Sequence, residues 1–276
     1  STGLTLVILM GKNDISVGST VSMAAVVVAL LNQAGMPTVL VILIPLVMGL
    51  AIGAFNGVLV AKLKFDYWVV AFASMSIFAG LALVLTNGVT IPVKNEVLDW
   101  IGNGKILGLY VIIWITILLV GLMVLVQKKT RFGYNVYSIG GSENVANVSG
   151  IKVVKTRIWV YALAGLFAAV AGVAISCMTN SGSPSVGVEY SFNAMAAVVI
   201  GGTSMAGGKG GILGTVFGTV LLRVLASGLS LMGIPATWQK ALIGVVIVTM
   251  IVVDVANEHR KNIKGLRRVY GHVTGS

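Results

Sequence analysis

Residues 201–211 include glycines and a lysine, the residue types that form phosphate-binding loops. They read Gly-Gly-Thr-Ser-Met-Ala-Gly-Gly-Lys-Gly-Gly. A phosphate loop requires four residues between its first glycine and its Gly-Lys pair, followed by Ser or Thr. Here Thr203 stands where that first glycine should be, and Gly210 follows Lys209. The spacing therefore argues against ATP binding, and we expect this chain to bind no cofactor.

The same stretch separates two apolar segments, which leaves two interpretations open. Unwound backbone inside a membrane is tolerated where protein or a water-filled cavity satisfies it, so broken helices often line transport paths. A tight cytoplasmic turn would explain the glycines equally well, and Lys209 favours that alternative. On the first interpretation, the candidate pathway residues are Gly201, Gly202, Thr203 and Ser204.

A second polar break, at residues 11–19, contains Asp14, Ser16 and Gly18. Asp14 precedes an apolar run, so its carboxylate could cap a helix, where free N–H groups meet the positive end of the dipole. Direct contact with a transported solute is the alternative, and it makes these three residues candidate pathway residues. Arg223 joins them, because a charge in the middle of an apolar segment should face a bundle interior or a cavity.

Groups for enzyme chemistry or ion coupling are scarce. Both histidines, His259 and His272, lie in the C-terminal tail, and there is one cysteine. The carboxylates of Asp66, Glu189 and Asp254 lie near the ends of apolar segments, whereas proton-coupled carriers commonly need buried acids or histidines. We therefore expect no catalytic residue, no metal site and no enzyme activity in this chain.

The elements that carry these residues are expected to be membrane helices. Of the 276 residues, 57% are hydrophobic and 10% are charged, whereas soluble domains have about a quarter charged. A spanning helix needs about 20 apolar residues. The apolar runs predict an N-terminal fragment at 4–10 and about eight spans or part-spans: 15–31, 39–61, 68–85, 107–126, 158–178, a short 192–200 that could re-enter rather than span, 212–231 and 241–253.

This pattern predicts an all-α polytopic helical bundle that forms one transmembrane domain over residues 1–276. The apolar start without Met indicates an N-terminal truncation. Three segments also have small residues at four-residue spacing, which permits the close helix packing that associates helices in lipid. These residues are Gly49, Gly53 and Gly57; Ala164, Ala168 and Gly172; and Gly210, Gly214 and Gly218.

The net charge of +11 has an uneven distribution. Basic residues gather at 62–64, in a central loop at about 128–157 and in a tail at about 254–276. Alternating spans put these three groups on one side, which the positive-inside rule assigns to the cytoplasm. We therefore expect a multi-pass protein with a cytoplasmic C-terminus, whose basic surface meets anionic lipid headgroups rather than nucleic acid.

The central loop has features typical of a docking site. Ser142 can cap a short helix that ends at Gly150. Such a helix would present Val145 and Val148 as an exposed apolar ridge, and exposed ridges of this kind favour docking to a partner. The candidate docking residues are Ser142, Glu143, Asn144, Ala146, Val148 and Gly150.

Four stretches resemble the permease subunits of bacterial ABC importers for ribose and other simple sugars. They are Asp14–Ser19, Thr130–Gly141, Ser142–Val153 and Ala196–Gly214. The order and spacing of the four stretches match the family. Together with the predicted spans, they extend the resemblance over nearly all of the chain. The Lys12-Asn13 pair and Arg223 depart from the family's pattern.

The resemblance implies a permease of the bacterial cytoplasmic membrane that forms the path for a monosaccharide. It implies cytoplasmic ATPase subunits that bind and hydrolyse ATP, an extracellular or periplasmic sugar-binding protein, and a second permease copy or a paralogue. Residues 142–150 correspond to the family's coupling segment, which would pass the motion of the ATPases to the spans.

Two other functions remain open: a branched-chain amino-acid ABC permease, and a self-sufficient secondary transporter or channel. The glycine-rich stretch at 201–210 resembles the sugar branch more than the first alternative. The second alternative needs a site for a driving ion and no docking helix, whereas the sequence has a docking helix and no buried carboxylate in a span centre.

Overall fold

A computed structural model describes residues 1–235 and, beyond these, residues 238, 241, 244–245, 248–249 and 252. The chain divides into two compact units, Ser1–Thr219 and Val220–Ser276. The predicted tail at about 254–276 and much of the predicted segment 241–253 lie outside the described residues. The first unit contains all the packing described below.

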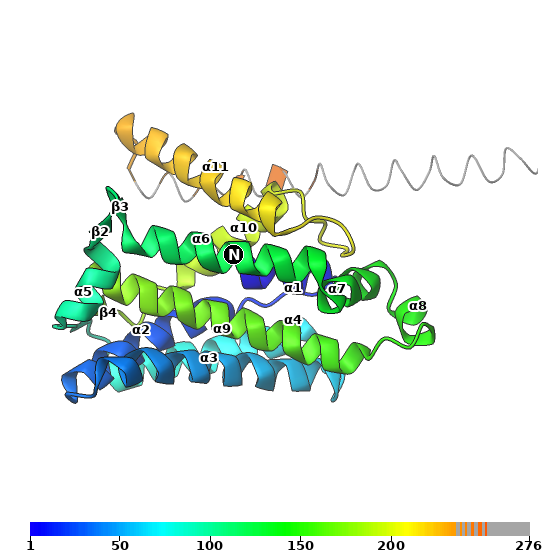
Figure 1. The fold of residues 1–276 in the computed structure, drawn as a ribbon, viewed down its shortest axis with the longest axis horizontal. Coiled ribbons are helices and arrows are strands. Elements are labelled where there is room, and N and C mark those ends of the chain that lie inside the picture. Colours follow the sequence, from blue (N-terminus) through cyan, green and yellow to red (C-terminus); the bar gives the residue numbers. More distant parts are fainter. Residues whose placement is uncertain (236–237, 239–240, 242–243, 246–247, 250–251, 253–276) are drawn as a thin grey trace, which may run out of the picture. The chain divides into compact units, whose positions relative to one another are not determined.

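Helices make up most of the described chain (Figure 1). In order they are α1 (Thr2–Leu9), α2 (Val17–Gln33), α3 (Thr38–Ala61), α4 (Tyr67–Thr86), α5 (Glu96–Asn103), α6 (Val111–Lys129), α7 (Arg131–Gly141), α8 (Glu143–Val148), α9 (Val153–Thr179), α10 (Val188–Ile200) and α11 (Ile212–Leu231). Two antiparallel pairs of short strands accompany them: β1 (Ile91–Pro92) with β4 (Ser181–Gly182), and β2 (Lys105–Ile106) with β3 (Leu109–Tyr110).

Five of these helices are long and apolar enough to cross a membrane: α3, α4, α6, α9 and α11. The prediction of an all-α, multi-pass membrane protein is therefore confirmed. Helices α2 and α10 are apolar but shorter. The 13 residues of α10 extend about 20 Å at 1.5 Å per residue, less than the roughly 30 Å of a hydrocarbon core. Helix α10 is therefore a part-span.

The apolar runs do not predict α5 and α7, and the structure corrects the long loop expected at 128–157. Both helices are amphipathic rather than uniformly apolar. Helix α5 is capped at its N-terminus by Asn95, whose Oδ1 accepts hydrogen bonds from the backbone N–H groups of Val97 and Leu98. Helix α7 buries Gly133, Val136 and Ile139, which are spaced at three residues and therefore share one face.

The stripe of Gly49, Gly53 and Gly57 brings α3 against α9. A methyl group at Gly53 would overlap the backbone of Tyr161, and one at Gly49 would overlap Gly165. Close packing through small residues replaces the hydrophobic driving force that lipid does not supply. The predicted stripe therefore marks a real helix contact, in which backbone meets backbone.

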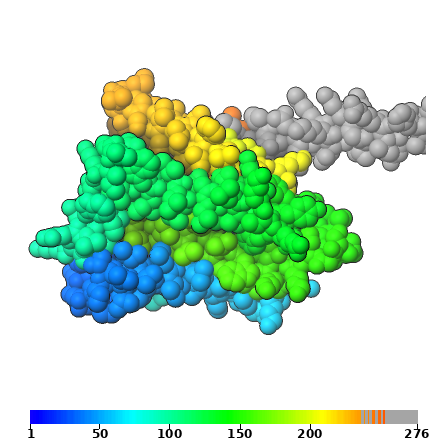
Figure 2. Space-filling model, viewed as in Figure 1, coloured from blue at the N-terminus to red at the C-terminus, as the bar shows by residue number. Residues whose placement is uncertain are grey.

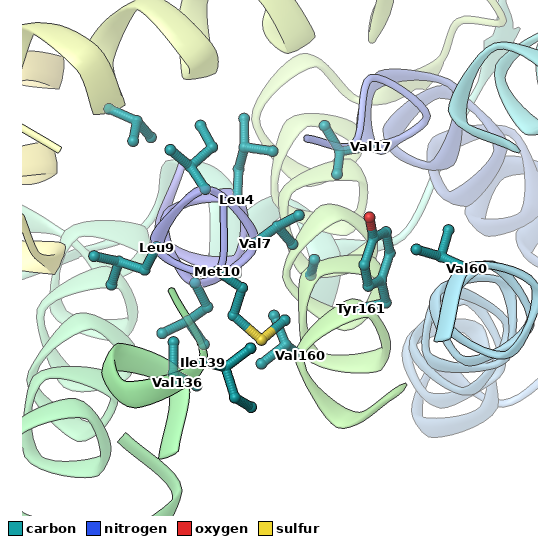
Figure 3. Packing of buried hydrophobic residues seen from close by; sticks show 14 of the residues in the cluster. Leu4, Val7, Leu9, Met10, Val17, Val60, Val136, Ile139, Val160 and Tyr161 are labelled. Atoms are coloured by element: carbon teal, nitrogen blue, oxygen red, sulfur yellow. The ribbon is translucent and has the colours of Figure 1, made fainter. Parts of the chain in front are cut away.

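Helix α1 lies in the centre of the main apolar cluster (Figure 3). Its residues from Gly3 to Leu9 are all buried. Figure 3 shows side chains of α7 and α9, among them Ile139 and Val160, gathered around its C-terminal end. The predicted N-terminal fragment is thus an enclosed helix of the first unit.

Helices α7 and α8 lie at one end of the first unit, whereas α5 and the β2–β3 pair lie at the opposite end (Figure 1). The space-filling view from the same side shows the α7–α8 segment, in green, forming that end (Figure 2). We call the two ends the α8 end and the α5 end. The α8 end also contains the C-termini of α3 and α6 and the N-termini of α4 and α9.

Candidate functional site

The break between α1 and α2 is built around a buried carboxylate. Asp14 is 2% exposed, and its Oδ1 accepts hydrogen bonds from the backbone N–H and the hydroxyl of Ser16, at 3.0 and 2.5 Å. The residue before α2 is Ser16, which makes no side-chain cap bond. The predicted capping role of Asp14 is therefore wrong in detail, because its carboxylate closes the turn that precedes the helix.

A chain of side-chain hydrogen bonds continues from this turn into α3 and α4. Asn56 Nδ2 donates to Ser16 Oγ at 3.0 Å, and Ser74 Oγ donates to Asn56 Oδ1 at 2.5 Å. Each of these residues is at most 3% exposed. Buried polar groups are costly unless they are hydrogen-bonded, so this network holds the α1–α2 break in one position. We call Asp14, Ser16, Asn56 and Ser74 the Asp14 network.

Helices α9 and α10 contact the same break from the other side. Tyr161 of α9 donates its hydroxyl to the carbonyl of Asn13 at 3.4 Å. Ser191 of α10 donates to the carbonyl of Ile15 at 2.9 Å. Gly18 packs against Gly187, just before α10, with no room for a side chain between them. The candidate residues Asp14, Ser16 and Gly18 are thus brought together where four helices converge.

The glycine-rich stretch forms a folded turn between α10 and α11 at the α8 end. Thr203 is 1% exposed, and its Oγ1 accepts a hydrogen bond from the N–H of Gly211 at 3.2 Å. The N–H of Gly208 donates to the carbonyl of Leu9, at the end of α1, at 2.8 Å. Of the two interpretations, this geometry favours the turn. The candidate residues Gly201, Gly202, Thr203 and Ser204 belong to it.

Gln127 and Tyr137, which the sequence does not single out, hold this turn in place. Gln127 is 4% exposed, donates through Nε2 to Tyr137 Oη at 2.8 Å and accepts from the N–H of Ile212 at 3.0 Å. Tyr137 Oη then donates to the carbonyl of Gly210 at 2.6 Å. The turn is thereby tied to the end of α6 and to α7.

Helix α8 has the caps that its sequence predicts. Ser142 Oγ accepts a hydrogen bond from the N–H of Val145 at 3.4 Å, and Gly150 takes a φ of +80° beyond the helix. Ala146 is 1% exposed and belongs to the main apolar cluster, whereas Val145 and Val148 are 61% and 87% exposed. The predicted exposed ridge is confirmed. Ala146 itself faces inward, so it anchors α8 and offers no docking surface.

An ion pair fixes α8 to α9. Arg157 Nη2 lies 2.7 Å from Glu143 Oε2, with the two side chains 8% and 47% exposed. The pKa of Glu143 lies below its usual value because Arg157 donates this hydrogen bond; partial burial opposes the shift, and nearby positive charges reinforce it. The other candidates on this segment, Asn144 and Gly150, are exposed.

Arg223 lies on α11 in the second unit, and its side chain is exposed there. This differs from the inward-facing position that we expect for a charge in mid-segment. Among the residues that the structure describes, no cluster of three or more His, Cys, Asp and Glu side chains could hold a metal ion. The candidate sites are therefore the α1–α2 break and the α8 segment.

Comparisons with known proteins match most of the chain. The sequence model of the family described as "Branched-chain amino acid transport system / permease component" matches residues 1–251. The ribose import permease protein RbsC of Bacillus subtilis (strain 168) is 37% identical over 254 residues, which is 91% of this chain and 79% of that protein. The protein of the same name from Escherichia coli (strain K12) is 36% identical over 256 residues, 91% of this chain and 80% of that protein.

A third relative is the xylose transport system permease protein XylH of Escherichia coli (strain K12). It is 31% identical over an alignment of 321 residues that covers 94% of this chain and 81% of that protein. No solved structure matches the chain.

Proposed function

The chain belongs to the branched-chain amino acid transport system / permease component family, and from this premise we propose that it is the membrane-spanning permease subunit of an ATP-driven importer for a monosaccharide. The family description names amino acids, but relatives 31–37% identical to the chain are named for ribose and xylose. These relatives favour a sugar over a branched-chain amino acid. The exposed ridge of α8 favours an ATP-driven importer over a self-sufficient carrier, because a carrier needs no docking surface for an ATPase.

The observation that carries this proposal is the construction of α8. Its inner face is anchored by Ala146 and by the Glu143–Arg157 pair, whereas Val145 and Val148 point to the outside. A surface helix gains nothing for its own fold from an exposed apolar ridge, but a partner can bury that ridge. We propose that α8 docks on a cytoplasmic ATPase subunit, where ATP is bound and hydrolysed.

A continuous set of contacts leads from α8 to the α1–α2 break. Arg157, which holds Glu143, lies one helical turn from Tyr161 on α9, and residues at this spacing share a face. The hydroxyl of Tyr161 reaches the carbonyl of Asn13, beside Asp14. We propose that a displacement of α8 moves α9 and so repositions this break, which makes Asp14, Ser16 and Gly18 the gate of the sugar pathway.

The proposed orientation places the α8 end in the cytoplasm. The basic residues of this end include Lys62, Lys64, Lys128, Lys129, Arg131, Lys152 and Lys155, and loops that carry such an excess remain inside. We further propose that the chain lies in the bacterial cytoplasmic membrane with its C-terminus in the cytoplasm, as the basic tail of the sequence favours. The α5 end would then face an extracellular or periplasmic sugar-binding protein, and a second permease copy or a paralogue would complete the pathway.

Uptake by the complete transporter tests the substrate class. The chain is reconstituted in liposomes with its ATPase and binding-protein partners, and ATP-dependent uptake of labelled D-ribose, D-xylose and L-leucine is compared. We expect accumulation of one of the sugars and background uptake of leucine. Accumulation of leucine alone would instead support the branched-chain amino-acid alternative.

A further inference from the structure

A basic pocket lies at the α8 end, between the C-terminus of α3, the N-terminus of α4, α8 and α9. Its volume is about 490 Å³, and its lining includes Lys12, Lys64 and Arg157 together with Asp66 and Glu143. It is separate from the Asp14 network and from the exposed ridge of α8. It shares Glu143 and Arg157 with the proposed coupling route, whereas Lys12 and Lys64 have no part in that route.

The two acids of the pocket are already engaged. Asp66 Oδ1 accepts hydrogen bonds from the N–H groups of Trp68 and Val69 and so caps α4, at 2.8 and 3.4 Å. Glu143 accepts from Arg157. Lys12 Nζ lies 5.0 Å from the ring centre of Tyr67, which attracts a cation without neutralising it. The lining therefore has three cations and two acids, which leaves one positive charge in excess.

Arg157 lacks an acceptor that its position demands. Its Nε is buried and has no hydrogen-bond partner among the described residues, although Nη2 is paired with Glu143. A buried charged donor without an acceptor costs more than the roughly 1–3 kcal/mol of a neutral one. A guanidinium has a planar fork of donors that matches carboxylate and phosphate groups. An anionic oxygen in the pocket would therefore match the donors of Arg157 that line it.

Lys64 is held in an unusual conformation at the mouth of the pocket. Its φ is +58°, in the left-handed region that residues other than glycine seldom adopt. Strain of this kind is found where the surrounding structure keeps a residue in place for binding. Within the part of the chain that the structure describes, Lys64 makes no ion pair, so its charge is available to a ligand.

The aromatic residues at the pocket are of the types found at the level of lipid headgroups. Phe65 in the lining and Trp68 on α4 are 55% and 37% exposed, and the ring centres of Tyr67 and Trp68 lie 5.6 Å apart. Tyr and Trp gather where a spanning helix leaves the hydrocarbon for the interface. A cation-lined pocket at the end of a spanning helix would be within reach of lipid phosphates.

We propose that this pocket binds a phosphate group, supplied by the headgroup of an anionic phospholipid, through Lys12, Lys64 and Arg157. The apolar residues Val60, Phe65 and Val153 complete the lining, as a headgroup with its adjoining glycerol requires. The lipid would then connect α3 and α4 to α8 and α9 at the α8 end.

The test measures lipid retention by the purified transporter complex. Native mass spectrometry after exchange into phosphatidylglycerol or phosphatidylcholine compares the wild type with a K12Q/K64Q double variant. We expect the wild type to retain phosphatidylglycerol selectively. In the double variant its apparent dissociation constant should rise about 30-fold, which is the loss expected for two cations at a membrane surface. Equal retention of both lipids by the wild type would overturn the proposal.

A matched control lies at the α5 end, where Lys105 Nζ is also 5.0 Å from the ring centre of a tyrosine, Tyr110. A K94Q/K105Q variant removes the same charge and should retain phosphatidylglycerol as the wild type does. If both double variants lost phosphatidylglycerol equally, the loss would follow from the change in net charge alone, and the proposed site would be refuted. Inorganic phosphate distinguishes the source of the phosphate group. If added phosphate displaces phosphatidylglycerol from the wild type, the pocket is a phosphate site that the lipid headgroup occupies. If phosphate binds but the wild type shows no preference between the two lipids, the lipid assignment is contradicted.

Discussion

Arg157 of α9 holds Glu143 of α8 through a hydrogen-bonded ion pair of 2.7 Å, with the arginine buried and the glutamate half exposed. This asymmetry gives α8 a fixed base and a free outer surface. The buried cation depends on its partner, because an unpaired charge inside a protein is strongly unfavourable. The pair therefore sets the position of α8 relative to α9.

Acidification should release this anchor. The pKa of Glu143 is lowered from about 4.5 chiefly by the hydrogen bond from Arg157. An acid whose folded pKa is depressed stabilises the fold above its unfolded pKa, and this contribution is lost as the pH falls through the folded pKa. We expect the Tm of the wild type to exceed that of an E143Q variant at neutral pH, and the difference to shrink only once the pH falls below about 4.5, through the depressed folded pKa of Glu143. A Tm difference that is independent of pH would contradict the role of this pair.

Charges on the exposed ridge of α8 should uncouple the transporter without unfolding it. Val145 and Val148 are exposed, so a V145E/V148E variant should change the free energy of unfolding by less than about 0.5 kcal/mol per site. We expect ATP-driven sugar uptake to fall at least about tenfold, as for loss of a buried interface contact. A V145L/V148L variant is the control, because it keeps the same two exposed positions apolar and should retain uptake. Normal uptake by the V145E/V148E variant would remove α8 from the coupling route.

The Asp14 network should be sensitive to a single hydroxyl. An S74A variant removes the donor to Asn56 Oδ1 and leaves that buried acceptor without its partner. We expect a loss of about 1–3 kcal/mol in stability, measured as the shift in Tm of the purified protein. Ser76 lies on the same helix but is exposed, so an S76A variant should leave Tm almost unchanged. Equal shifts would mean that the network contributes nothing.

The contact between α3 and α9 should leave no room for a methyl group at Gly53. A G53A variant places Cβ against the backbone of Tyr161, which cannot move as a flexible side chain would. We expect destabilisation of about 1–3 kcal/mol from overpacking. At Gly80 of α4, a Cβ would have no neighbouring atom within 4 Å, so G80A should be neutral or slightly stabilising. Thermal melts of both variants compare the two sites, and a stable G53A would contradict the close approach of these helices.

Apolar run length predicts the spanning helices well, because a membrane helix must be apolar over about 20 residues. The segment 212–231 coincides with α11, and 39–61 differs from α3 by one residue. Run length does not predict α5 and α7, whose apolar residues occupy one face only. It also places the start of α9 too late, because Lys155, Thr156 and Arg157 end the apolar run although the helix begins at Val153.

Local patterns predict the candidate site only in part. Ser142 and Gly150 mark α8 because caps depend on neighbouring residues. The partners of Asp14 do not follow from its surroundings in the sequence, since Asn56 and Ser74 come from other helices and meet Ser16 only in the folded bundle. The sequence around Gln127 does not indicate its role either. A single amide beside two lysines at the end of a span indicates an interfacial residue, not the support of a turn 85 residues away.

Solute accumulation in liposomes tests most directly whether this chain depends on an external source of energy. Liposomes containing the chain with its ATPase and binding-protein partners should concentrate the sugar when ATP is supplied and should fail to do so with V145E/V148E. Liposomes containing the chain alone should equilibrate the sugar at most, under either a proton or a sodium gradient. Accumulation by the chain alone under an ion gradient would contradict the account.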